Sequence, residues 1–128
     1  MGAQDRTAVE SWLAAYRRAW ETDDAGDIAA LFTEDATYSP WPFSKAWEGR
    51  DAIVANWIER GDSKNPWKFE SEVLAVEGDT GVIKGLTTYP AHDDEPEDAY
   101  SNIWVIRLAP DGRARSFAEW WVQRPKPE

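Results

Sequence analysis

In the first half of the chain, apolar residues recur three or four positions apart, which is the spacing of an amphipathic helix. This pattern predicts a helix over residues 7–22, opened by a capping box at Thr7 and Glu10. A second, shorter helix is expected around residues 28–32, and a third from Arg50 to Arg60. The apolar residues expected on the inner helix faces are Val9, Trp12, Leu13, Tyr16, Trp20, Ile28, Leu31, Phe32, Ile53, Val54, Trp57 and Ile58.

Between the second and third helices the helical spacing is lost. Residues 36–39 form a short extended stretch, and Pro40 and Pro42 prevent it from continuing as a central strand, because proline has no backbone donor. Residues 41–49 are expected to form a loop. From Pro66 onward the period changes to two, which predicts strands over about residues 67–77, 81–90, 99–109 and 113–123.

Helices followed by a meander of strands are typical of an α+β fold with an antiparallel sheet, not of a βαβ fold. The length of 128 residues is close to the usual size of one domain, so we expect residues 1–128 to form a single domain.

The last two strands are apolar on both faces. Trp104 and Ile106 alternate with Ile103 and Val105, and the last strand alternates in the same way. An antiparallel sheet with one wet face would instead alternate apolar and polar residues. Three short helices can cover only one face, so we expect the other face to pair with a second copy of the chain in a two-fold dimer. The residues expected at this contact are Val105, Trp120 and Val122.

Composition limits the class of partner. The chain has 24 acidic and 14 basic residues, a formal net charge of −10. That field repels phosphate backbones and anionic lipid headgroups, so neither nucleic acid nor a membrane is an expected partner. No cysteine is present, which excludes a thiolate nucleophile or a cysteine-ligated metal. No signal pattern or membrane-length apolar run is seen either, so a cytoplasmic location is expected.

Several stretches together resemble the nuclear transport factor 2-like superfamily, also called SnoaL-like or ketosteroid isomerase-like. They are Trp12 to Trp20, Asp27 to Thr37, Trp47 to Ile53, and the closing hairpin from Tyr100 to Trp121. The resemblance implies a cone-shaped half-barrel: three N-terminal helices packed on a strongly curved, mostly antiparallel sheet, with a pocket in the cone and frequent dimers through the outer sheet face. It fixes no reaction, because the superfamily contains isomerases, cyclases, dehydratases, epoxide hydrolases and binding modules.

The resemblance makes Tyr16 a candidate for stabilising an oxygen anion, since ketosteroid isomerases have a tyrosine at the matching place. Two departures argue against that particular reaction. Pro40 stands where the base carboxylate would be, and Trp104 stands where the second, neutral acid would be. Tyr16 therefore has two interpretations: an oxygen stabiliser, or a core tyrosine with a satisfied hydroxyl group.

Glu119 is a stronger candidate for a functional residue than Tyr16. Strand alternation puts it on one face with Phe117 and Trp121, and Asn102 and Trp104 on the neighbouring strand are expected to face the same way. A carboxylate between aromatic rings is poorly solvated, so its pKa should rise unless a cation or hydrogen-bond donors compensate. Such a group is either a general acid or base, or a structural carboxylate that is paired with an arginine or braces the pocket.

His92 is the single histidine and precedes the acidic run 93–98. It is a candidate proton shuttle, although a solvated hairpin tip accounts for the same pattern. One histidine cannot supply the ligand set of catalytic zinc, and the acidic run lacks the spacing of a calcium loop, so no metal is expected.

The tryptophans indicate an aromatic cavity that suits a flat, largely apolar small molecule, with Tyr16, Asn102 and Glu119 as its polar points. The residues expected to bind this ligand are Trp12, Tyr16, Trp20, Trp41, Trp57, Asn102, Trp104, Phe117, Glu119 and Trp121. No cofactor motif is present. The first hypothesis is a cofactor-free acid–base enzyme of the isomerase, cyclase or dehydratase class, with Glu119, Tyr16 and His92 as catalytic candidates. A dimeric binding module without turnover, or a domain whose cavity is filled by its own tryptophans, are the alternatives.

Overall fold

A computed structural model describes residues 6–60, 67–91, 94 and 96–125. These residues form three helices: α1 (Arg6–Thr22), α2 (Ala25–Ala29) and α3 (Arg50–Arg60). The first two precede the strands, and α3 lies between the second and third strands. The six strands are β1 (Phe32–Ser39), β2 (Trp47–Glu48), β3 (Lys68–Glu77), β4 (Thr80–Tyr89), β5 (Asp98–Leu108) and β6 (Ala114–Gln123).

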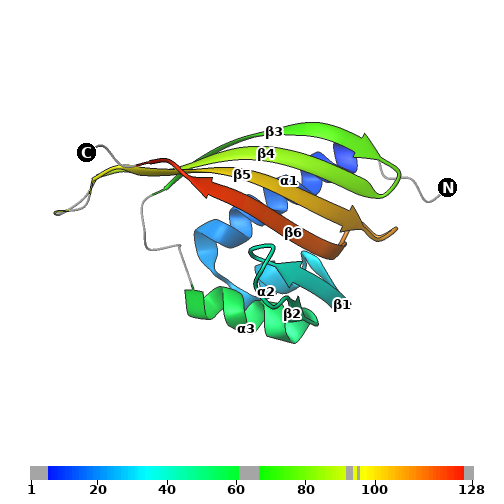
Figure 1. The fold of residues 1–128 in the computed structure, drawn as a ribbon. Coiled ribbons are helices and arrows are strands. Elements are labelled where there is room, and N and C mark those ends of the chain that lie inside the picture. The colour runs from blue at the N-terminus through cyan, green and yellow to red at the C-terminus, as the bar shows by residue number, and fades with distance from the viewer. Residues whose placement is uncertain (1–5, 61–66, 92–93, 95, 126–128) are drawn as a thin grey trace.

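The strands form one sheet in the order β2-β1-β6-β5-β4-β3. Every neighbouring pair is antiparallel except β1 and β6, which run parallel. Figure 1 shows this sheet arching over α1, with α2 and α3 gathered near β1 and β2. The fold is therefore the expected α+β class, with a curved and mostly antiparallel sheet that does not close.

The core lies between α1 and the concave face of the sheet. Val9 on α1 is fully buried and lies against Gly81 on β4, where an added Cβ would come within 2.9 Å of the valine side chain. Phe69 covers Gly85 in the same way. Gly81 lets the Val9 side chain of α1 approach the backbone of β4 closely, and Gly85 does the same for the Phe69 ring of the neighbouring strand β3.

The helices follow the sequence prediction in part. Ile58, expected on the inner face of the third helix, is 45% exposed, because the face of α3 that is buried carries Ile53 and Trp57. The second helix begins at Ala25, three residues earlier than expected. The third helix has the predicted bounds, and α1 begins one residue before them. The second helix ends at Ala29 and does not extend to residue 32, because Phe32 belongs to β1 and pairs with Ala114 on β6. The backbone N–H of Ala114 donates to the carbonyl of Leu31 over 2.7 Å, so long-range pairing takes over from the helical pattern at this point.

Two features of the sheet were absent from the prediction. β1 begins at Phe32 and not at residue 36, and it lies inside the sheet between β2 and β6. It ends at Ser39, immediately before Pro40, as expected from a residue that cannot donate. β2 lies where a loop was expected, because Trp47 and Glu48 pair with Tyr38 and Thr37.

The four long strands alternate as predicted. Asn102 pairs with Trp121, Trp104 with Glu119, and Ile106 with Phe117. Trp104, Ile106 and Phe117 are buried, so this register directs the whole row toward α1. The other register positions of β5 and β6 form the outer face, where Trp120 and Val122 are exposed over 47% and 69% of their surface. One face of the sheet therefore carries the core, and on the other face β6 exposes the apolar side chains of Trp120 and Val122.

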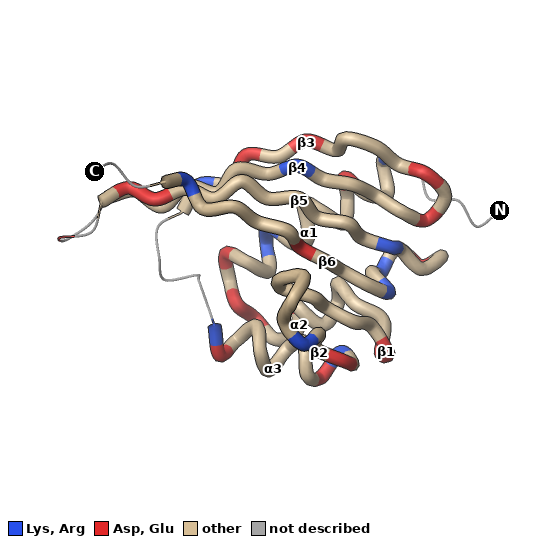
Figure 2. The backbone as a smooth tube through the Cα atoms, in the orientation of Figure 1, with Lys and Arg blue, Asp and Glu red and all other residues tan. Residues whose placement is uncertain are grey.

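Charged residues lie at strand ends, turns and helix surfaces and also along β3 and β4, while the centre of β5 is uncharged (Figure 2). In β6 the charged residues are Arg115, near the start, and Glu119, in the middle of the strand. No helix in the described part of the chain is long and apolar enough to cross a membrane.

Candidate functional site

A pocket of about 310 Å³ opens between α1, α3 and the concave face of the sheet. This volume is at the lower end of the range for small-molecule sites. Most of its lining side chains are aromatic. They are Tyr16, Trp20, Tyr38, Pro40, Trp47, Trp57, Arg60, Thr87, Tyr89, Tyr100, Asn102, Trp104, Glu119 and Trp121.

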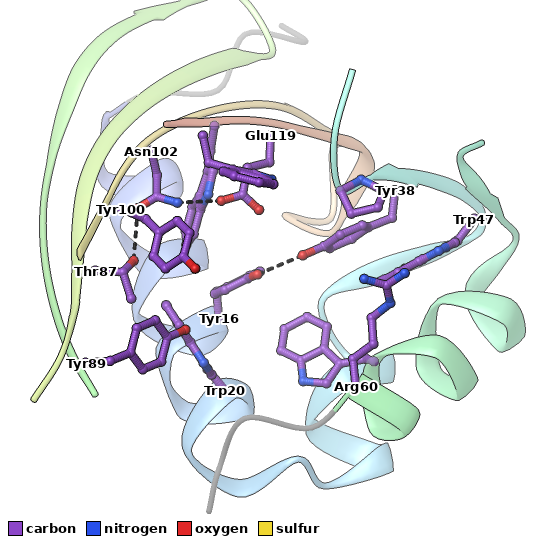
Figure 3. Close-up of a pocket in the computed structure, with 14 residues that line it drawn as sticks. Tyr16, Trp20, Tyr38, Trp47, Arg60, Thr87, Tyr89, Tyr100, Asn102 and Glu119 are labelled. Atoms are coloured by element: carbon purple, nitrogen blue, oxygen red, sulfur yellow. Dashed lines mark hydrogen bonds between the residues drawn. The ribbon is translucent and has the colours of Figure 1, made fainter. Parts of the chain in front are cut away.

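Glu119 supplies a carboxyl group to the wall formed by β5 and β6 (Figure 3). The side chain is mostly buried, and burial raises its pKa above the ordinary value because the charged form loses water. Hydrogen bonding toward Trp104 and Asn102 offsets part of that effect. Among the described residues no cation lies within ion-pair distance of this carboxyl.

Asn102 and Thr87 hold the carboxyl in place. The Asn102 side-chain amide donates to Glu119 Oε2 over 2.6 Å, and its carbonyl oxygen accepts from the Thr87 hydroxyl over 2.9 Å. Both residues are buried, at 6% and 3% exposure. With both partners satisfied, these polar groups cost little to bury and fix the side chain of Glu119 at one position.

The indole of Trp104 is the second donor beside Glu119. Its side chain is 2% exposed and its residue pairs with Glu119 across the two strands. The indole N–H is close enough to lower the pKa of Glu119, yet within the described residues it has no acceptor in full hydrogen-bond geometry. An incompletely satisfied buried donor at this position favours the charged form of the carboxyl.

A pair of buried tyrosines faces this wall from α1 and β1. The hydroxyl groups of Tyr16 and Tyr38 lie 2.9 Å apart, and both rings stack on Phe117, at centroid distances of 5.5 and 4.3 Å. One hydroxyl proton is used in the mutual bond, so one proton remains for an acceptor in the pocket. Burial, together with nearby Glu119, raises the pKa of both tyrosines, so both stay protonated.

Arg60 lies on the opposite side of the pocket from Glu119, at the end of α3 (Figure 3). Its guanidinium carbon is 5.3 Å from the centroid of the Trp47 ring. Trp47 in turn stacks on Tyr38 at 4.6 Å with an interplanar angle of 10°. The aromatic ladder therefore positions a cation at one end of the pocket.

The structure brings together most of the residues expected to bind ligand. Those that line the pocket are Tyr16, Trp20, Trp57, Asn102, Trp104, Glu119 and Trp121. Three expected residues lie elsewhere. Trp12 is in the core behind the pocket, where its indole N–H donates to the carbonyl of Leu31 over 3.0 Å. Phe117 is 1% exposed behind the two tyrosines, and Trp41 lies on the surface against Phe43. His92 lies outside the described residues.

Sequence reasoning missed half of the wall. The missed residues are Tyr38, Pro40, Trp47, Arg60, Thr87, Tyr89 and Tyr100. Strand alternation carries a signal for three of them, because Tyr100 shares its parity with Asn102 and pairs with Thr87 across β4 and β5, and Tyr89 shares its parity with Thr87. Trp47 was expected only as part of the loop over residues 41–49. Nothing in the local pattern identifies Arg60.

Comparison with solved structures shows the fold. The chain is similar to a structure described as the epoxide hydrolase/cyclase-like enzyme SalBIII, which acts in pyran ring formation in the polyether salinomycin. The TM-score is 0.74 at 20% sequence identity, over 92% of this chain and 93% of that one.

Comparison of the sequence finds one curated relative and one matching family. The chain is 32% identical over 73 residues to sodium/sulfate cotransporter 2 of Chlamydomonas reinhardtii, a match that spans 56% of this chain and 8% of the cotransporter. The SnoaL-like domain family matches residues 13–117, which include both tyrosines, α3 and most of the sheet. The fold and this match together show that the chain belongs to the SnoaL-like family, within the nuclear transport factor 2-like superfamily.

Proposed function

We propose that the pocket binds a small, mostly apolar or aromatic molecule that carries an oxygen acceptor, and that Glu119 moves a proton on it without a cofactor. The observation that carries this proposal is a mostly buried carboxyl group, held by Asn102 over 2.6 Å and without an ion-pair partner among the described residues. A carboxyl of this kind is costly to keep for packing alone.

The two walls of the pocket suit complementary roles. In its charged form Glu119 accepts a proton from the substrate, and its raised pKa brings it closer to neutral pH, where general bases work best. The spare hydroxyl proton of the Tyr16–Tyr38 pair donates to the oxygen on which negative charge develops. Glu119 then returns the proton at another atom of the substrate, so the net reaction is an isomerisation, cyclisation or elimination.

Family membership is consistent with this class of chemistry. The SnoaL-like relative SalBIII is described as epoxide hydrolase/cyclase-like, and ring formation of that type requires proton transfer between oxygens. Fold likeness alone does not transfer an activity, so the proposal rests on the carboxyl and the tyrosine pair.

A binding module without turnover is the second candidate. Pro40 favours it, because the resemblance to ketosteroid isomerases places the base carboxylate at this residue, and Pro40 lines the pocket without a titratable group. In that case Glu119 serves only as an acceptor for a ligand hydroxyl or amine.

Deuterium exchange separates the two candidates. A panel of cyclic aromatic and aliphatic ketones is incubated with the protein in heavy water, and loss of the α-proton signal is followed by NMR. We expect the wild type to accelerate exchange of at least one ketone and Glu119→Gln to bind that ketone without exchanging it. Glu70→Gln is the matched control, since Glu70 is exposed on β3 and outside the pocket. If the wild type binds a ketone but does not exchange its α-proton, the catalytic proposal is wrong and the protein is a binding module.

A further inference from the structure

Of the described residues that line the pocket, Arg60 is the basic one and Glu119 is the acidic one. The two residues come from α3 and β6, on opposite sides of the pocket (Figure 3). A ligand that fills the space therefore meets a cation on one side and a carboxyl group on the other, with the Tyr16–Tyr38 hydroxyl pair between them (Figure 3). Most of the remaining lining is aromatic.

The Arg60 guanidinium is held by an aromatic ring and not by an acid. It lies 5.3 Å from the centroid of Trp47, a distance at which the ring quadrupole attracts a cation. Within the described residues it has no ion-pair partner. The arginines that do pair with an acid in this part of the chain are Arg107, Arg113, Arg115 and Arg124.

Arg6, Arg17, Arg18 and Arg50 also lack an ion-pair partner among the described residues, so the absence of an acid is not what distinguishes Arg60. Arg60 is distinguished by its place in the pocket lining, beside the ring of Trp47. The N–H groups of a guanidinium form a planar fork that matches the two oxygens of a carboxylate.

We propose that Arg60 binds a carboxylate on the ligand, so that the ligand class is an aromatic or apolar carboxylic acid. This inference rests on the proposed function of the pocket and adds the anionic group to it. Repulsion between the ligand carboxylate and Glu119 orients the molecule. In the proposed orientation its acid end meets Arg60, and its reactive oxygen lies between Glu119 and the Tyr16–Tyr38 pair.

The charge balance favours a carboxylate over a phosphate. A phosphate monoester carries close to two negative charges at neutral pH and needs several donors or cations. Among the residues that the structure describes, the pocket lining contains a single arginine and no lysine, and the whole chain carries −10. One planar guanidinium neutralises one carboxylate, which suits these surroundings.

Calorimetric titration with two probes of the same shape tests the assignment. Naphthoate carries the carboxylate, and methyl naphthyl ketone is its neutral counterpart. We expect the wild type to bind naphthoate more tightly than the ketone. Arg60→Gln should weaken naphthoate binding by about tenfold or more while changing ketone binding by less than about twofold. Arg60→Lys should recover part of the affinity, because it keeps the charge and loses the planar fork.

Arg18→Gln is the matched control, since it removes one positive charge from an exposed position of α1 outside the pocket. It should leave both affinities unchanged. If Arg60→Gln weakens the binding of both probes equally, Arg60 has only a packing role and the inference is wrong. So would a wild type that binds naphthoate no better than the ketone, or not at all.

The Glu119→Gln variant separates this inference from the proposed function. We expect it to bind naphthoate at least as tightly as the wild type, because a like charge is removed. If ketone exchange fails in every variant while naphthoate still depends on Arg60, the catalytic proposal falls and the carboxylate site stands. If ketone exchange depends on Glu119 while naphthoate binding does not depend on Arg60, the catalytic proposal stands and the carboxylate site is wrong.

Discussion

The side-chain amide of Asn102 bridges Glu119 and Thr87, with hydrogen bonds of 2.6 and 2.9 Å. Its orientation is fixed chemically, since the reversed amide would set the carbonyl oxygen against the carboxyl group of Glu119. Thr87 is on β4, Asn102 on β5 and Glu119 on β6, so the bridge crosses three neighbouring strands. It links the position of the candidate proton carrier to the register of the sheet.

The bridge predicts how substitutions move the pKa of Glu119. Asn102→Leu removes a donor that favours the charged form, so the pKa should rise further above its ordinary value. Thr87→Val should raise it less, because the amide remains but can turn away. An NMR titration of the labelled glutamate carboxyl, or the acid limb of the ketone-exchange profile, measures the change. An unchanged or lower pKa in Asn102→Leu would contradict the assigned role.

Glu119 should also make stability depend on pH. Its folded-state pKa is raised above the ordinary 4.5, so the folded protein binds this proton more tightly than the unfolded chain does. The stabilising contribution of Glu119 is therefore complete below about pH 4.5 and is lost as the pH rises through the folded-state pKa. The Glu119→Gln variant does not lose stability in this way, because glutamine does not titrate. Its free energy of unfolding, relative to wild type, should increase over the same pH window.

Urea unfolding of both proteins at a series of pH values measures this difference. Taking the difference matters, because many other carboxyl groups titrate in the acid range and cancel between the two chains. A difference that is flat with pH, or that falls as pH rises, would show that the folded-state pKa is not raised.

The Tyr16–Tyr38 pair predicts non-additive energetics. Tyr16→Phe or Tyr38→Phe leaves one buried hydroxyl without its 2.9 Å partner, so each should destabilise the protein by about 1–2 kcal/mol. The double variant removes both hydroxyls and keeps both rings on Phe117, so it should cost less than the sum of the two. Urea unfolding of the four proteins gives the cycle, and strict additivity would mean that the hydroxyls do not interact in solution.

Much of the fold follows from local pattern because its long elements are strongly periodic. The alternation of residues in β5 and β6 is sufficient to place Asn102 and Glu119 on one face, and the apolar spacing in α3 places both ends of that helix. Phe32 and Trp47 escaped this reasoning. Each belongs to a strand only because a partner distant along the chain, Ala114 or Tyr38, pairs with it.

The pocket was only half predictable for a related reason. Alternation tells which face a side chain occupies but not its depth beneath that face. Phe117 and Glu119 share a face, yet Phe117 is sealed behind the tyrosines while Glu119 reaches the pocket. In the sequence Arg60 looks like a solvated residue at a helix end, and only its contact with Trp47 in the folded chain identifies it as part of the pocket lining.

The outer face of the sheet supports a last prediction. We propose that it pairs with a second copy of the chain. Trp120 is 47% exposed and Val122 69% exposed, and Val105 lies on the same face. Trp120→Glu or Val105→Glu places a charge on this apolar surface, so each should give a monomer or an aggregate, while the wild type sediments at about twice 14.5 kDa. Trp41→Glu makes the same change at a surface tryptophan on the β1–β2 loop and should leave the dimer intact. If the wild type remains at 14.5 kDa at high concentration, the dimer proposal is wrong. The apolar outer face would then be stable in water without a partner.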